Sequence, residues 1–222
     1  MIDENTTKAE VLEAVKQDGW YLRFASDDLK NDKDVVLAAV RQSGFALEFA
    51  SKELRGDREV VMAALKQCGI RLAYASDELR GDKEVVLAAV REEGLALKYA
   101  SAELKRDREV VLAAMKQCRV ALRYASDELK DDRGFMLEAV TENWLALEYA
   151  SAELKNDRDF MLEAVRQFGS VLCYASDELR NDRDVVMAAM KQDMLAFCYA
   201  SEELKIEMAA CWANAIEQGL VN

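Results

Sequence analysis

The chain has 222 residues, of which 30 are Lys or Arg and 42 are Asp or Glu, so its formal net charge is −12. It contains neither His nor Pro, which excludes Ser–His–Asp and Cys–His catalytic pairs, His zinc sites and polyproline ligands. The acidic balance argues against nucleic-acid binding, because such binding depends on Lys and Arg that neutralise phosphates.

We expect neither a targeting segment nor a cofactor. The segment Met1–Thr6 is acidic and polar, unlike a secretory signal, and no apolar run approaches the roughly 18 residues of a transmembrane helix. The five cysteines lack the CxxC spacing of zinc and redox motifs, so we expect free thiols in a reducing, cytoplasmic compartment. Lys or Arg interrupts every acidic cluster and no EF-hand spacing occurs, so we expect no metal.

A fixed period of 25 residues organises the chain. Asp recurs at this interval from Asp32 to Asp182, and a Leu follows three residues after each repeated Ser. Such a period indicates stacked supersecondary repeats, each unable to bury its apolar face alone. The dipeptide Ala-Ser marks the period and begins at Ala25, Ala50, Ala75, Ala100, Ala125, Ala150, Ala175 and Ala200.

The repeat that begins at Asp82 illustrates the predicted elements. Asp82 is a good N-cap, and the apolar run over residues 85–90 predicts a helix that Gly94 ends in a left-handed conformation. A shorter helix is predicted over about residues 95–100, followed by one 3₁₀ turn over residues 101–104. The apolar arc of the first helix covers about 200°, which suits a helix with neighbours on both sides.

Both ends depart from the repeat, as capping repeats do. An N-terminal cap is predicted over about residues 6–24, where Thr7 takes the Asp position. A C-terminal cap is predicted over about residues 206–222, where Glu207 replaces Asp and the helix is expected to end near Gly219.

The pattern as a whole predicts an all-α fold. We expect a right-handed-type α-solenoid or superhelix of about eight 25-residue two-helix repeats, with capping helices at both ends. The period leaves the handedness open. No linker or composition break divides the sequence, so residues 1–222 are predicted to form a single repeat domain.

Polar as well as apolar positions of the repeat match a known family. The phrase Tyr-Ala-Ser-x-Glu-Leu-[Lys/Arg]-x-Asp-[Lys/Arg]-[Asp/Glu]-Val-Val-Leu-Ala-Ala-Val occurs almost verbatim at Tyr74–Val90 and Tyr99–Met115. It resembles the repeat catalogued as domain of unknown function 4116. The resemblance covers nearly the whole chain and implies tandem arrays in which two 25-residue units form one repeat. It implies no activity. The alternation survives at Asp27, Asp77, Asp127 and Asp177.

Residues that recur in most repeats are interpreted as structural. Ser101, Asp107 and their equivalents suit helix starts, and Tyr99 and its equivalents suit the edge of a core. A single active site has no use for seven or eight copies of each group. We therefore expect that the protein is not an enzyme.

Function is sought where the repeats differ. Three outward-facing columns vary, and apolar side chains gather in them in the C-terminal half, which is typical of a surface that contacts a partner. The alternative is that these side chains fill gaps between helices. The predicted partner-binding residues are Trp144, Phe168, Cys173, Met194, Cys198, Arg123 and Glu148.

A second candidate surface follows the first helices. Small residues in a row would leave a shallow groove for a peptide, although Ala is also simply the best helix former. The row consists of Ala38, Ala63, Ala88, Ala113 and Ala188.

The sequence thus predicts a non-enzymatic repeat protein that acts as a protein-binding scaffold. Its partner would be another protein or peptide, without nucleic acid or membrane, and we expect a monomer or a weak oligomer. The alternative is a structural rod, or an accessory domain of an effector or enzyme assembly whose chemistry lies on another chain. An enzyme would need a deep pocket with an unrepeated polar group.

Overall fold

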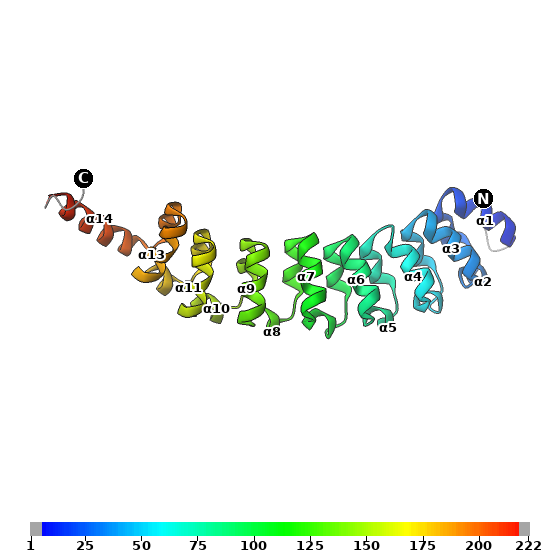
Figure 1. Ribbon diagram of the computed structural model, residues 1–222. Coiled ribbons are helices and arrows are strands. Elements are labelled where there is room, and N and C mark those ends of the chain that lie inside the picture. The colour runs from blue at the N-terminus through cyan, green and yellow to red at the C-terminus, as the bar shows by residue number, and fades with distance from the viewer. Residues whose placement is uncertain (1–5, 218–222) are drawn as a thin grey trace. The chain divides into compact units, whose positions relative to one another are not determined.

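The computed structural model describes residues 6–217, without the side chains of residues 212, 213 and 215–217. Within that range every element is an α-helix or a 3₁₀ helix (η), so the predicted all-α repeat fold is confirmed (Figure 1). None of these helices combines the length and apolarity that crossing a bilayer requires. The segment 1–5 and the predicted helix end near Gly219 lie outside the described residues.

The chain divides into two compact units, residues 1–126 and residues 127–222, and the assignment of residues 1–222 to one domain stays a prediction. The N-terminal unit consists of α1 (Lys8–Gln17), η1 (Gly19–Phe24), α2 (Asp27–Lys30), α3 (Lys33–Gln42), η2 (Gly44–Phe49), η3 (Leu54–Gly56), α4 (Arg58–Leu65), η4 (Gly69–Tyr74), α5 (Asp77–Arg80), α6 (Lys83–Glu92), η5 (Gly94–Tyr99), η6 (Leu104–Arg106), α7 (Arg108–Gln117) and η7 (Arg119–Tyr124). The C-terminal unit consists of α8 (Asp127–Lys130), α9 (Arg133–Glu142), η8 (Trp144–Tyr149), α10 (Ala152–Asn156), α11 (Arg158–Gln167), η9 (Gly169–Tyr174), α12 (Asp177–Arg180), α13 (Arg183–Gln192), η10 (Met194–Tyr199) and α14 (Glu202–Glu217).

Each repeat is therefore a long α-helix, a six-residue 3₁₀ helix and a short third helix. Inside each unit the long helices pack against their neighbours in chain order. The core lies between the long helices and the 3₁₀ helices, and it consists of fully buried side chains such as Val85, Val86 and Leu97. Because the apolar arc of the long helix meets a neighbour on each side, no repeat has a core of its own.

The prediction that Gly94 ends the long helix in a left-handed conformation is wrong. Glu93 ends α6 in an extended conformation, with φ −150° and ψ 108°, and Gly94 begins η5. Glycine is needed there for another reason, since a Cβ on Gly94 would lie 2.3 Å from the carbonyl oxygen of Ala114 in the next long helix. The same close approach to the next repeat, 2.2–2.7 Å, occurs at Gly19, Gly44, Gly69 and Gly169.

One joint between repeats has a bulky residue at this glycine position and is looser than its neighbour. Trp144 takes the position in the repeat of α9, and α9 packs less closely against α11 than α11 does against α13, where Gly169 is present. The core side chains of α9 and α11 are also larger. Phe135 and Phe160 are completely buried where other repeats have Val, and we infer that they fill the wider space.

The repeated Asp links consecutive repeats as well as capping its own helix. Asp57 Oδ1 accepts hydrogen bonds from the backbone N–H of Glu59 at 3.0 Å and of Val60 at 3.2 Å. Its Oδ2 lies 2.8 Å from the ammonium of Lys33 in the preceding repeat. That hydrogen bond from Lys33 is the main reason why the pKa of Asp57 is lowered.

We expect Asp57→Ala to lower the free energy of unfolding by about 1–2 kcal/mol, mostly through the lost cap. Asp57→Asn keeps a capping oxygen and loses only the ion pair, which contributes at most about 1 kcal/mol. Because the folded state binds the Asp57 proton less tightly than the unfolded chain does, this contribution is present above the unfolded pKa of about 4 and is lost as the pH falls through the lower folded pKa.

Thermal denaturation of the wild type and of Asp57→Asn between pH 7 and pH 2.5 tests this. The difference in melting temperature should shrink as the pH falls below about 4. A difference that stays constant over the whole range would contradict the role of the Lys33 ion pair.

The repeated Ser is likewise a structural residue. Ser101 Oγ accepts a hydrogen bond from the backbone N–H of Leu104 at 3.3 Å, and the Ser101 N–H donates to the carbonyl of Arg80 in the preceding repeat at 2.9 Å. In the N-terminal unit the 50-residue alternation appears in the short helix that follows. Asp77 starts α5, an α-helix with an ion pair between Asp77 and Arg80, whereas η6, which follows Ala102, is a 3₁₀ helix. In the C-terminal unit this difference is absent, because α10, which Ala152 starts, is an α-helix.

The last repeat merges two elements that are separate elsewhere. A single helix, α14, runs from Glu202 to Glu217, through the position where an extended Asp would otherwise interrupt it. Ile206 and Glu207 stand at that position, and Glu is a poor N-cap. The predicted C-terminal cap thus belongs to a helix that starts at Glu202, four residues before the predicted boundary.

Candidate functional site

The structure separates the predicted partner-binding residues by environment. Trp144 is half-buried and its ring lies against Tyr174, with centroids 6.3 Å apart and planes tilted by 42°. That geometry favours the gap-filling interpretation for Trp144. Phe168 and Met194 are 36% and 62% exposed, which is compatible with a contact surface.

The remaining predicted residues occupy equivalent positions in different repeats. Each is the penultimate residue of a six-residue 3₁₀ helix, and we call this the outer position. Glu148 and Cys198 are exposed there, and Cys173 is half-buried. Burial is the main cause that raises the pKa of the Cys173 thiol, so this thiol is protonated at neutral pH. Arg123 is exposed at the outer position of η7 and belongs to the N-terminal unit.

Met194 belongs to an apolar groove at the end of the C-terminal unit. The groove has a volume of about 410 Å³ and lies between α13, η10 and α14. Two strongly exposed side chains occur on the same elements, Leu195 in η10 at 77% and Ile206 in α14 at 71%. We call this feature the C-terminal groove; its lining residues are Met190, Met194, Phe197, Met208 and Ala209.

A half-buried cation follows each repeated Ser by four residues, and we call this row the basic ladder. An aromatic residue precedes each repeated Ala, and we call this row the aromatic ladder. Both rows recur in every repeat, so the sequence alone does not distinguish one member from another. The basic ladder is Lys30, Arg55, Arg80, Lys105, Lys130, Lys155, Arg180 and Lys205, and the aromatic ladder is Phe24, Phe49, Tyr74, Tyr99, Tyr124, Tyr149, Tyr174 and Tyr199.

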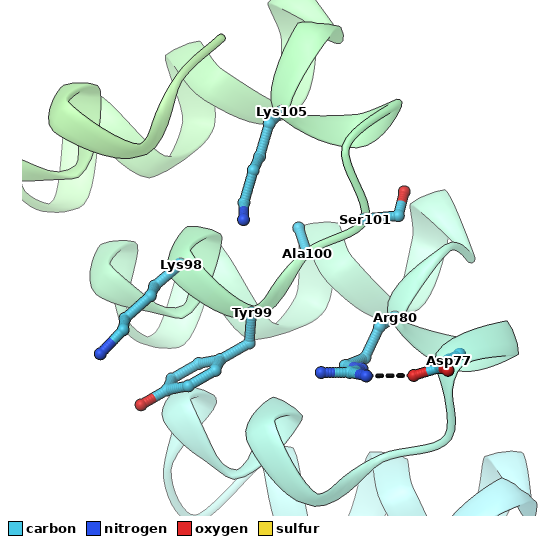
Figure 2. A pocket seen from close by; sticks show the side chains of 7 residues that line it. All are labelled: Asp77, Arg80, Lys98, Tyr99, Ala100, Ser101 and Lys105. Carbon is cyan, nitrogen blue, oxygen red and sulfur yellow. Dashed lines mark hydrogen bonds and ion pairs between the residues drawn. The ribbon is translucent and has the colours of Figure 1, made fainter.

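A cleft of about 280 Å³ lies between two members of the basic ladder, and we call it the Arg80–Lys105 cleft. Figure 2 shows Arg80 and Lys105 reaching into it from neighbouring repeats, beside the ring of Tyr99. Lys98, at the outer position, places its ammonium 5.5 Å from the centre of that ring. The full lining is Asp77, Arg80, Lys98, Tyr99, Ala100, Ser101 and Lys105.

One buried cation is not repeated and was missed by the sequence reasoning. Arg71 is only 7% exposed, at a position where most other repeats have Ala, and its guanidinium lies 3.3 Å from the centre of the Phe45 ring. This cation–π contact stabilises the buried charge, although the Nε of Arg71 has no hydrogen-bond partner among the described residues. Arg71 lines neither of the two clefts described above, so we interpret it as part of the packing between η2 and η4.

The predicted groove along the alanine row exists as separate clefts between long helices. One cleft of about 390 Å³ contains Ala63, with Glu59 and Lys66 beside it, and a similar one contains Ala113. Charges of both signs line them. No group of three or more Cys, Asp or Glu side chains among the described residues is arranged to hold a metal ion.

Comparison with known proteins gives a family and no activity. The family model described as domain of unknown function 4116 matches the chain four times in tandem, over residues 11–55, 57–105, 107–155 and 157–205. Each match spans two 25-residue units, which confirms the predicted 50-residue repeat. No curated protein and no solved structure matches the chain significantly.

Proposed function

The chain belongs to the family of domain of unknown function 4116, a family whose description gives no activity, so its function must be inferred from its structure. We propose that it is a non-enzymatic repeat scaffold that binds another protein or peptide through the C-terminal groove. The observation that carries this proposal is the exposure of large apolar side chains at one end of the C-terminal unit. Met194, Leu195 and Ile206 are 62%, 77% and 71% exposed, whereas most side chains of their size in this chain are buried.

The chemistry of the groove favours an apolar segment of a partner, such as one face of an amphipathic helix. Met190, Met194 and Met208 contribute flexible, polarizable side chains that adapt to the shape of what they contact. Charged residues precede the lining residue Met208 on α14, where Glu202 pairs with Lys205. The apolar side chains of the groove would supply most of the binding affinity, and these charges would fix the orientation of the bound segment.

Two further features support other parts of the proposal, its non-enzymatic character and its compartment. The repeated Asp and Ser groups already act as caps and inter-repeat links, as at Asp57 and Ser101. The five cysteines are free, which fits the reducing, cytoplasmic compartment that we propose. We propose no nucleic-acid or membrane partner, and a monomeric or weakly oligomeric chain.

Binding should be weakened when Met194, which lines the groove, and the exposed Leu195 next to it in η10 are made polar. We expect a protein captured from the native host by the intact chain to bind a Met194→Ser, Leu195→Ser double variant at least tenfold more weakly, because burial of both side chains stabilises the complex. The captured protein would be purified and its dissociation constant measured by isothermal titration calorimetry.

Met187→Ser is the matched control, since Met187 is 39% exposed but does not line the groove. Circular dichroism would check that both variants keep the helical content of the wild type. Equal binding by the double variant, or equal loss in the control, would contradict the proposal and favour the structural rod or accessory domain.

A further inference from the structure

The Arg80–Lys105 cleft has counterparts at 50-residue intervals, in which the same basic-ladder and aromatic-ladder positions recur. Only the outer position differs in charge among them. It is occupied in turn by Glu48, Lys98, Glu148 and Cys198. Two of the counterparts therefore have a Glu at the outer position, whereas the Arg80–Lys105 cleft has a third cation there.

The ladder cation of one counterpart, Lys155, is compensated in two ways. The ammonium of Lys155 donates a hydrogen bond to the backbone carbonyl of Glu148 at 2.7 Å. Burial lowers the pKa of Lys155, and the charge of Glu148 opposes that effect. The cation of this repeat thus has both a hydrogen-bond acceptor and a countercharge.

Lys105 has neither. Among the described residues its ammonium forms no hydrogen bond and no ion pair, although the side chain is half-buried. Burial lowers the pKa of Lys105, and the charge of Arg80 lowers it further. Asp77 is the only carboxylate among the lining residues, and it is paired with Arg80 (Figure 2). The cleft therefore contains three cations and one carboxylate, in a chain whose net charge is −12.

We propose that the Arg80–Lys105 cleft binds a phosphate-type oxyanion. The guanidinium of Arg80 and the ammonium groups of Lys98 and Lys105 would donate charge-assisted hydrogen bonds to its oxygens, and the Tyr99 ring would contact the group that carries it. A volume of about 280 Å³ admits a phosphate with part of its carrier. The backbone hydrogen bond from Ser101 to Arg80 fixes the two repeats that form the cleft. This site lies in the N-terminal unit, so it does not depend on the proposed role of the C-terminal groove.

The test is a titration of the full chain with inorganic phosphate at constant ionic strength and pH 7.5, followed by NMR. We expect saturable shifts of the Tyr99 and Lys105 resonances. Lys98→Glu, which copies the Glu148 counterpart, and Lys105→Gln should each weaken binding at least tenfold. Lys155→Gln is the matched control, and it should leave the affinity unchanged.

A second titration with phenyl phosphate distinguishes the source of the oxyanion. Tighter binding of phenyl phosphate would indicate a phosphate carried on a larger molecule, and equal binding would indicate the free ion. Shifts that do not saturate, shifts that chloride reproduces at the same ionic strength, or equal loss in Lys155→Gln would overturn the proposal. Circular dichroism of each variant separates lost binding from lost folding.

Discussion

Gly94→Ala is expected to lower the free energy of unfolding by about 3 kcal/mol, which corresponds to a fall in melting temperature of roughly 6–12 °C for a chain of this size. The added Cβ would lie 2.3 Å from the carbonyl oxygen of Ala114. Backbone cannot move aside as a flexible side chain can, so α6 and α7 would have to separate. Thermal denaturation followed by circular dichroism measures the effect.

Gly134→Ala provides the matched control for this substitution. Gly134 is exposed in the first turn of α9, and an added Cβ would lie 3.4 Å from Asp132 Oδ1, an ordinary contact. Because Ala favours a helix over Gly, we expect Gly134→Ala to raise stability by about 0.5 kcal/mol. If Gly94→Ala also left the melting temperature unchanged or raised it, the close approach of the repeats would not explain the glycine.

Phe160→Ala is expected to lower the free energy of unfolding by about 3–5 kcal/mol, because a completely buried aromatic side chain leaves a cavity that its neighbours only partly fill. Urea denaturation of the purified chain, followed by circular dichroism, measures this loss. Phe168→Ala serves as the control, since Phe168 is 36% exposed and should change the free energy by less than about 1 kcal/mol. Equal losses in both variants would show that Phe168 belongs to the core and not to a contact surface.

The fold can be predicted from the sequence because every repeat contains the same local pattern. The Asp cap, the apolar run and the Ser turn each predict an element, and their fixed spacing predicts the stack. The local pattern does not predict which residues of neighbouring repeats contact one another. Gly94 suggested a left-handed helix end, a property of one residue, whereas its role is set by the carbonyl of Ala114, twenty residues away.

The candidate sites illustrate the same difference. Met194 stood out because it replaces a glycine in a variable column, and the structure places it in an apolar groove. Arg80 and Lys105 did not stand out, because every repeat has a cation at their position. Their significance depends on Lys98, which belongs to a different column and meets them only once the repeats stack. Comparing corresponding columns in space, rather than one column at a time, could have found this cleft.

The loosened joint at Trp144 has a consequence for how the chain unfolds. In a linear array, cooperativity depends on the interfacial energy between neighbouring repeats. Where α9 and α11 pack less closely than α11 and α13, that energy is smaller, and the loss of one repeat is transmitted less completely to the next. The C-terminal unit is thus expected to open in parts, and amide hydrogen exchange should begin at the seam between α9 and α11 and spread outward from it.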